Sequence, residues 1–593
     1  MAFQDFGDLS ERRRREKQQR LKQKITVAVI SVLVLILIIA SCVVAIVYRS
    51  GHNTKKQETA GTTKQVTHST NRIKMICDAT DFKQTCESKL GNIMSSNSTN
   101  HPKDLLKAAI FAIIDELETS FLNVSSKFKT DNPDESKALE DCHVLLGDAI
   151  EELDASADHV GGDDIEKLPQ RTHDLDNWLS AVMSYQETCI DGFPDGKLKS
   201  DIQKAFKTAK ELTSNSLAIV SEMTTILSAL QVPGITHRRL LGKEEDDELS
   251  TIVKDKRPNW MSHEDRRALQ QAPGTADLKP NVVVAKDGSG AFKTISEALA
   301  AMPAKYTGRY IIYVKTGVYD ETVTVGKKMV NVTMYGDGPE KTVVTGSKNF
   351  VDGVRTFQTA TFVALGDGFM ARDMCFKNTA GPEKHQAVAL RVQSDRSVFY
   401  NCRIDGYQDT LYTQTHRQFY TNCTVLGTID FIFGDASAII QDSTLIVRRP
   451  LDNQQNSVTA QGRADKRETT GLVIQNCIIK ANYALLPVKF KIKSYLGRPW
   501  KEYSRTIIME SMIGNLIAPE GWMPWQGDFA LKTLNYVEYS NKGPGAATGA
   551  RVKWPGYKSS MTKDEAMKYT VEPFLGDWVK PTGVPVQIGL YDK

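Results

Sequence analysis

The 593-residue chain carries little excess charge, with 75 Lys and Arg residues against 71 Asp and Glu residues and a net charge of +4. Because a nucleic-acid-binding protein needs a concentrated basic face, this balance argues against nucleic acid as a partner. Cysteine is also scarce: there are nine, and Cys42 lies within an apolar run. The other eight are free to pair in an oxidising compartment.

Long apolar runs are limited to the N-terminal region, where residues 25–48 follow a basic tail at residues 1–24. A membrane-spanning helix needs about 20 apolar residues, whereas the apolar core of a secretory signal has about 7–15. The length therefore favours an uncleaved transmembrane signal anchor with its N-terminus in the cytoplasm. A long cleaved signal peptide is the alternative. Both interpretations send the rest of the chain into the secretory pathway.

Helical periodicity marks the N-terminal half of the remaining chain. Residues 49–70 are polar and indicate a stalk. Within residues 71–232, apolar side chains recur at steps of three and four, as at Leu106, Ile110 and Ile113. This pattern predicts amphipathic helices in a small antiparallel bundle, which we expect to be a four-helix bundle.

Four cysteines fall in the helical region. Cys77 and Cys86 are close enough in sequence to close a short hairpin, and Cys142 and Cys189 are placed to tie two helices. Four cysteines allow three connectivities, and the periodicity alone does not choose among them.

Residues 233–280 show neither the apolar periodicity of a helix nor that of a strand. They contain an acidic run at residues 244–248 and two dibasic sites, at Arg238 with Arg239 and at Arg266 with Arg267. One interpretation is a solvated linker. The other is a processing linker, cut by a protease in the secretory pathway to release the C-terminal domain.

Residues 281–593 change to short β-type runs separated by Gly, Asp and Asn. A local motif recurs through this region at a period of about 20 residues or more, which is typical of a solenoid. With strands and no helices between the repeats, the solenoid is a parallel β-helix. A β-sandwich would not repeat one motif at one register. The repeated positions are Cys375, Cys402, Cys423, Ser443 and Cys477.

Chemistry-bearing residues recur at the same period. Gln386 and Gln408 are 22 residues apart, and Asp409 and Asp430 are 21 apart. Because neighbouring strands lie about 4.7–4.9 Å apart, successive coils would stack both carboxyl groups on one face beside two amides.

Two such carboxyl groups cannot both ionise cheaply, so one can attack as a nucleophile while its neighbour donates a proton. Gln386 and Gln408 suit a developing oxyanion, Arg498 could hold one Asp ionised, and Trp500 could pack on a sugar ring. A structural alternative is that Asp and Gln only satisfy backbone groups in β-helix turns. Spacing also does not separate ester cleavage from glycosidic cleavage.

Five segments resemble the signature segments of plant pectin methylesterases and occur in the family's order. The resemblance implies a right-handed parallel β-helix that removes methyl esters from homogalacturonan without a metal or cofactor. The helical half is similar to the pectin methylesterase inhibitor domain, and the dibasic sites resemble the processing sites of precursor forms. The segments are residues 317–321, 386–391, 406–412, 427–434 and 496–500.

The resemblance also implies residue roles. Asp430 would be the nucleophile on the ester carbonyl. Asp409 would protonate methanol and then activate water. Gln408 and Gln386 would stabilise the oxyanion, and Gln386 would also contact the substrate. Arg498 would fix Asp430, Trp500 would pack on the sugar, and Thr356 would be a further substrate-binding position.

The chain departs from the family pattern at two places. Val354-Arg-Thr-Phe stands where members commonly have Trp-Thr-Thr-Phe, which affects the subsites around Thr356. Ser443 replaces an expected cysteine, so Cys477 loses its expected partner, while Cys375 with Cys402 is the disulfide we expect and Cys423 is unassigned.

Three functions are compatible with a β-helix of this kind. They are a pectin methylesterase made as an inhibitor-fused precursor, another β-helix polysaccharide enzyme such as a glycosidase or lyase, and a non-catalytic wall-binding or inhibitor protein. The acidic pair and Arg498 favour the first. We expect a membrane-anchored precursor whose product reaches the cell wall, with homogalacturonan, the chain's own helical domain or separate inhibitor proteins, and a processing protease as partners. Glycans could attach at the sequons of Asn97, Asn123, Asn331 and Asn422.

Overall fold

The computed structural model describes residues 73–96, 102–127, 130–161, 171–223, 225–226 and 279–591. Ser69 to Lys593 form one compact unit. Within the described ranges no helix is long and apolar enough to cross a membrane. The expected tail, anchor and stalk and both dibasic sites lie outside these ranges.

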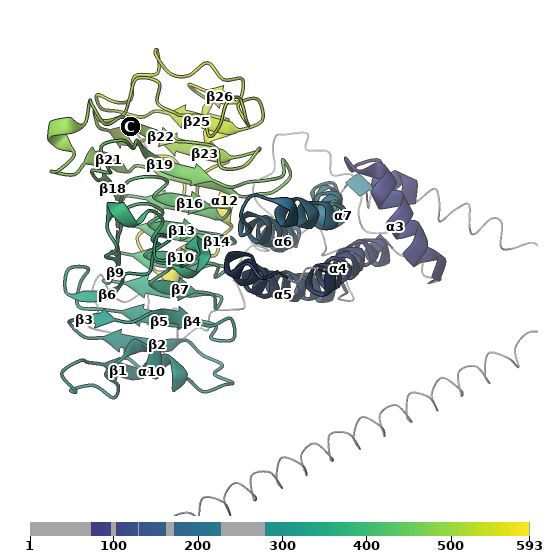
Figure 1. The fold of residues 1–593 in the computed structure, drawn as a ribbon, viewed down its shortest axis with the longest axis horizontal. Helices are drawn as coiled ribbons and strands as arrows, with labels where there is room; N and C mark the ends of the chain where they lie inside the picture. Colours follow the sequence, from purple (N-terminus) through teal and green to yellow (C-terminus); the bar gives the residue numbers. More distant parts are fainter. Residues whose placement is uncertain are drawn as a thin grey trace, which may run out of the picture. The chain divides into compact units, whose positions relative to one another are not determined.

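The helical half is built from long helices joined by short connections (Figure 1). Helix α4 packs against α5 and α7, and α6 also packs against α5 and α7. The described part includes α3 as well, so a count of four helices is not confirmed. The bounds are α3 (Lys83–Ser96), α4 (Pro102–Lys127), α5 (Pro133–Gly161), α6 (Thr172–Asp191) and α7 (Lys197–Ser221).

Local sequence explains where these helices form. Helices α4 and α5 begin at Pro102 and Pro133, because proline suits the first turn, where its missing N–H costs nothing. Along α7, Ile202, Phe206 and Ala209 are fully buried on one stripe. Two disulfides then cross-link the half, namely Cys77–Cys86 and Cys142–Cys189, the second of which joins α5 to α6.

The C-terminal half winds through three parallel sheets in a repeating order, which makes it a parallel β-helix (Figure 1). The eleven-stranded sheet contains β1 (Val282–Val284), β2 (Tyr310–Val314), β5 (Val332–Tyr335), β8 (Met370–Arg372), β11 (Ser397–Tyr400), β14 (Arg417–Thr421), β17 (Ser437–Gln441), β20 (Gly471–Gln475), β23 (Arg505–Met509), β25 (Asn535–Tyr539) and β26 (Tyr557–Lys558).

The other two sheets contribute one strand each to most coils. The eight-stranded sheet contains β3 (Gly317–Asp320), β6 (Thr342–Gly346), β9 (Cys375–Asn378), β12 (Arg403–Asp405), β15 (Thr424–Gly427), β18 (Thr444–Val447), β21 (Ile478–Ala481) and β24 (Met512–Ile513). The seven-stranded sheet contains β4 (Val323–Val325), β7 (Phe362–Ala364), β10 (Leu390–Val392), β13 (Leu411–Thr413), β16 (Ile432–Gly434), β19 (Asn456–Gln461) and β22 (Ser494–Gly497).

The repeated sequence motif lies at the corner of each coil where the chain passes from the eleven-stranded to the eight-stranded sheet. Asn401, Asn422, Asp442 and Asn476 each precede a repeated Cys or Ser and have positive φ values of 50° to 53°. Asn and Asp tolerate this left-handed backbone better than other side chains. Their side chains also bond from coil to coil, as in Asn476 Nδ2 to Asp442 Oδ1 at 2.7 Å. The predicted solenoid is therefore confirmed.

The expected disulfide between Cys375 and Cys402 does not form, since both thiols are free and buried. The register explains the difference. Cys375 lies opposite Arg403 rather than Cys402, whereas Thr424 pairs with Arg403 and so places Cys423 beside Cys402. Cys423 and Cys477 are also free and buried.

Two of the four sequons fall in described turns of the β-helix. Asn422 is exposed and Asn331 is partly buried. Asn97 lies outside the described residues, and the side chain of Asn123 on α4 is not described. Glycosylation stays a prediction.

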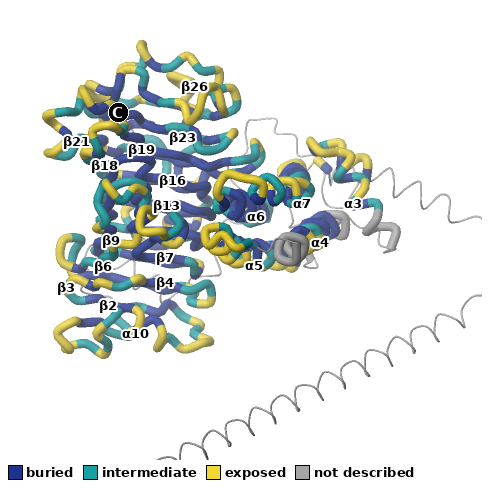
Figure 2. The backbone as a smooth tube through the Cα atoms, in the orientation of Figure 1, coloured by how far each residue is buried: buried dark blue, intermediate teal, exposed yellow. Residues whose placement is uncertain are grey.

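Side chains inside the coils form the main core, while the outer face of the seven-stranded sheet packs against the helical half (Figure 2). Phe357, Tyr412 and Phe433 share a hydrophobic cluster with Leu175 and Leu179 of α6. The short helix α12 (Val571–Leu575) packs on β17 of the eleven-stranded sheet. The other short helices are α10 (Ile295–Ala300) and α11 (Lys563–Met567).

Candidate active site

The two aspartates occupy equivalent turns on neighbouring coils, just before β13 and β16. Leu411 pairs with Ile432 in register, so Asp409 and Asp430, each two residues earlier, lie side by side. Both have left-handed backbones, with φ values of 61° and 48°, and both are buried. A left-handed turn with a buried carboxyl group is a conformation that the fold must stabilise elsewhere, and such strain is common at functional sites.

Two glutamine amides lie beside this pair. Gln386 and Gln408 face each other across a parallel bridge on neighbouring coils. Their Oε1 atoms are buried with no hydrogen-bond partner among the described residues. Each amide therefore has an oxygen acceptor that no described residue of the protein uses. Both glutamines line the same cavity as the aspartates.

Arg498 gives the two carboxyl groups different electrostatic environments. Its Nε lies 2.9 Å from Asp430 Oδ1, and its Nη2 lies 2.6 Å from Asp430 Oδ2. Burial, and then the negative charge of Asp430, raise the pKa of Asp409 well above its usual range, against a smaller opposing effect of Arg498. The two carboxyl groups thus differ in environment: Asp430 is paired with an arginine, while the protonated form of Asp409 is favoured.

Aromatic side chains line the cavity next to the acidic pair. Trp500 lies edge-on to Phe433 and Tyr412, with ring centroids 6.0 and 6.5 Å apart. A Cβ atom at Gly462 would be 2.8 Å from the Trp500 ring, so glycine is required for this packing. Trp525 stacks on the Arg498 guanidinium at 4.3 Å.

The cavity has a volume of about 1340 Å³, and all the predicted catalytic and substrate-binding residues line it. Sequence reasoning missed Arg355, Lys501 and Trp525, which also line it. Lys501 directly follows the Leu-Gly-Arg-Pro-Trp segment, and this position could have indicated from the sequence that it belongs to the site. Among the described residues no group of three or more His, Cys, Asp or Glu side chains is arranged to hold a metal ion. The predicted site residues at the cavity are Thr356, Gln386, Gln408, Asp409, Asp430, Arg498 and Trp500.

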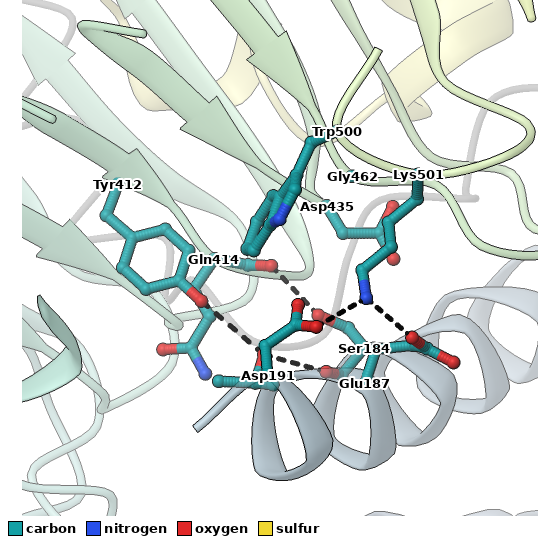
Figure 3. A pocket seen from close by; sticks show the side chains of 10 residues that line it. Ser184, Glu187, Asp191, Tyr412, Gln414, Asp435, Gly462, Trp500 and Lys501 are labelled. Atoms are coloured by element: carbon teal, nitrogen blue, oxygen red, sulfur yellow. Dashed lines mark hydrogen bonds and ion pairs between the residues drawn. The ribbon is translucent and has the colours of Figure 1, made fainter. Parts of the chain in front are cut away.

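Helix α6 closes one side of this region (Figure 3). The Nζ atom of Lys501 lies 2.7 Å from Glu187 Oε2 and 2.7 Å from Asp191 Oδ1. Burial lowers the pKa of Lys501, but Asp191 and Glu187 outweigh it and raise the pKa above its usual range. Ser184 Oγ donates to the Gln414 carbonyl at 3.1 Å, and Thr188 Oγ1 lies 3.4 Å from Tyr412 Oη.

Known proteins match both halves. Residues 281–577 match the family described as Pectinesterase. A putative pectinesterase/pectinesterase inhibitor 45 of Arabidopsis thaliana is 53% identical over 88% of this chain and 84% of its own length. The chain belongs to the pectinesterase family. Residues 71–219 of this pectinesterase match the family of plant invertase/pectin methylesterase inhibitors.

Other relatives support the same assignment. Pectinesterase 3 of Citrus sinensis is 41% identical over 87% of this chain and 88% of its own. A solved pectin methylesterase from carrot is 53% identical, with a TM-score of 0.52, and the match covers 53% of this chain and 99% of the carrot chain. The solved carrot chain thus corresponds in length to the pectinesterase half alone and is folded at that length.

Proposed function

We propose that the β-helix half removes methyl esters from homogalacturonan and releases methanol. In the first step, Asp430 attacks the ester carbonyl carbon, and amide N–H groups of Gln386 and Gln408 stabilise the negative oxygen that forms. The proton of Asp409 passes to the departing methoxy group. This step leaves an acyl-enzyme on Asp430 and an ionised Asp409.

The second step returns the enzyme to its starting state. Ionised Asp409 takes a proton from a water molecule as the water attacks the acyl carbon. The bond to Asp430 breaks, Asp409 is again protonated, and the galacturonic acid that is released loses its remaining proton to solvent and becomes a carboxylate. Trp500 and Thr356 would contact the sugar chain along the cavity.

One observation carries this proposal, namely the different environments of the two carboxyl groups. Asp430 accepts two hydrogen bonds from the Arg498 guanidinium, while the pKa of the buried Asp409 is raised. A nucleophile must be charged and a general acid must hold a proton, so the environments match the two roles.

We expect the separated β-helix half, residues 270–593, to release methanol from methyl-esterified homogalacturonan without shortening it. Methanol would be measured enzymatically and chain length by size-exclusion chromatography. A glycosidase or lyase would shorten the polymer, and a non-catalytic wall-binding protein would release nothing. Either result would contradict the proposal.

We also propose that the helical half is an inhibitor-type four-helix bundle, formed by α4 to α7, that blocks the cleft in the precursor. The support is the Lys501 ion pairs with Glu187 and Asp191 beside Trp500. Residues 25–48 would anchor the precursor in the membrane, and cleavage by a protease at a dibasic site would release the right-handed β-helix to the cell wall.

Docking of the two halves should depend on pH through His416. Its Nε2 lies 3.3 Å from Glu152 Oε1 and 3.3 Å from the Tyr185 hydroxyl, and Asn177 Nδ2 lies 3.1 Å from its Nδ1. Burial lowers the pKa of His416, but Glu152, with Asp395 and Asp367, raises it above the usual value.

Because Glu152 of the helical half raises the docked pKa of His416, the contribution of His416 to docking is full below its pKa in the separated β-helix half and is lost as pH rises through the docked pKa. His173 opposes this effect, since burial and then Arg417 lower its pKa. With the linker cut, the dissociation constant of the wild-type halves should increase about fivefold or more from pH 5 to pH 8 relative to His416→Gln. Parallel pH dependence in the two proteins would contradict this role of His416.

A further inference from the structure

Arg355 and Gln358 form a cradle that holds a carboxylate at both of its oxygens. Arg355 Nε donates to Asp141 Oδ2 at 3.1 Å, and Gln358 Nε2 donates to Asp141 Oδ1 at 2.7 Å. Both cradle residues belong to the β-helix half, around the short 3₁₀ turn Thr356–Gln358. Asp141 belongs to α5 of the helical half and is buried.

Among the described residues, the positive charge of the cradle is matched from across the interface. The Arg355 guanidinium donates hydrogen bonds to Asp141 and to the Asp134 carbonyl, 3.3 Å away, both on α5. Gly192, which follows α6, also lies against it, since a Cβ atom there would be 3.0 Å from Nη2. When the helical half leaves, these partners leave with it, and an arginine and an amide face the solvent.

Arg355 of the cradle lies in the same cavity as the acidic pair. Arg355 and Asp141 both line it together with Asp409 and Asp430. The turn carrying Arg355 precedes β7, and β10 and β13 follow β7 in the seven-stranded sheet. Two strand spacings, about 10 Å, therefore separate the cradle's coil from that of Asp409. A polysaccharide in the cavity would reach both with different sugars.

We propose that Arg355 and Gln358 bind a free galacturonate carboxylate of partly demethylated homogalacturonan, and that Asp141 occupies this subsite in the precursor as a carboxylate mimic. This proposal rests on the proposed function. A carboxylate accepts charge-assisted hydrogen bonds from a guanidinium, whereas a methyl ester is neutral and binds it weakly. The enzyme would therefore favour esters that lie a short distance along the chain from an acid already formed.

The specificity test compares fully esterified with half-esterified homogalacturonan, using the separated β-helix half. The readout is kcat/KM for methanol release from the half-esterified polymer divided by that from the fully esterified polymer. Arg355→Gln should lower this ratio about tenfold, the usual loss when a charged hydrogen-bond partner is removed. Arg355→Lys should restore part of it, because the charge stays but the planar fork is lost.

Arg372→Gln is the matched control. Arg372 ends β8 and pairs at 3.0 Å with Asp373, which lies on the turn between the eleven- and eight-stranded sheets. Neither residue belongs to the seven-stranded sheet, beside which the cavity lies. Its ratio should equal that of the wild type. If Arg355→Gln also keeps the wild-type ratio within twofold, the subsite proposal is overturned while the esterase function stands.

A binding measurement separates failure of this proposal from failure of the proposed function. Calorimetry with an unesterified galacturonate oligomer needs no catalysis, and Arg355→Gln should weaken binding about tenfold. Equal affinities would refute the subsite. Absence of methanol release from both polymers by the wild type would instead refute the esterase function.

The mimicry is tested by a double-mutant cycle on docking of the two halves after the linker is cut. Asp141→Asn should weaken docking in the wild-type background and change it little in the Arg355→Gln background, because the shared contact is already gone. Additive losses would overturn the mimicry.

Discussion

Asp430→Asn in the separated β-helix half should lower kcat for methanol release by about 10⁴-fold or more, because an amide cannot attack the ester carbonyl. The turn should keep its conformation, since asparagine tolerates the positive φ of 48° at this position. Arg498 loses its ion pair, so the thermal unfolding midpoint should fall modestly. Methanol release and calorimetric melting measure the two effects separately.

Asp442→Asn provides the matched control for this substitution. Asp442 also has a left-handed backbone, with φ of 51°, but it is exposed on the turn between the eleven- and eight-stranded sheets. Its variant should keep wild-type activity. Near-normal methanol release from Asp430→Asn would remove the nucleophile assignment, whatever the control shows.

Removal of the helical half should increase methanol release from polymeric substrate by about 50-fold or more, because the unblocked state is rare while the halves are joined. The expectation rests on the packing of Tyr412 and Phe433 with α6 and on the ion pairs of Lys501. The experiment compares the unit Ser69–Lys593 with the same protein after the linker is cut and the halves are separated.

A third sample distinguishes cutting from dissociation. The cut protein with its halves still bound should remain as inactive as the uncut unit, and activity should appear only on separation. Lys501→Met should weaken docking, since Glu187 and Asp191 would lose their shared cation. Equal activity of the joined and separated forms would rule out inhibition in cis and leave the helical half a role in folding or export.

The β-helix could be predicted because its repeat is local. A coil must turn at the same place each time, and Asn401, Asn422 and Asn476 are the residues that such a turn prefers. Helix α6 lies within the region predicted to be helical, but no apolar stripe marks it, because it is buried on nearly every face, including polar residues such as Ser180, Ser184 and Gln186. A helix that packs on two partners shows no apolar stripe.

The candidate pairs Cys77–Cys86 and Cys142–Cys189 are disulfides, but the expected Cys375–Cys402 disulfide is not. Cys375 and Cys402 hold similar positions in the repeat, but the register sets them one residue out of step, and no local pattern reports that shift. Arg355 and Gln358 were not predicted because their partner, Asp141, lies more than 200 residues earlier in the chain.

The sequence by itself determined the solenoid and the stacking of Asp409 beside Asp430, because both follow from a short motif repeated at a constant period. It also indicated the family, through the resemblance of five segments to the family's signature segments. Only the tertiary structure decided which cysteines of the β-helix face each other and which cations of the cavity meet the acids of the helical half. These depend on distances between coils and between domains, where segments far apart in the chain come into contact and sequence spacing carries no information.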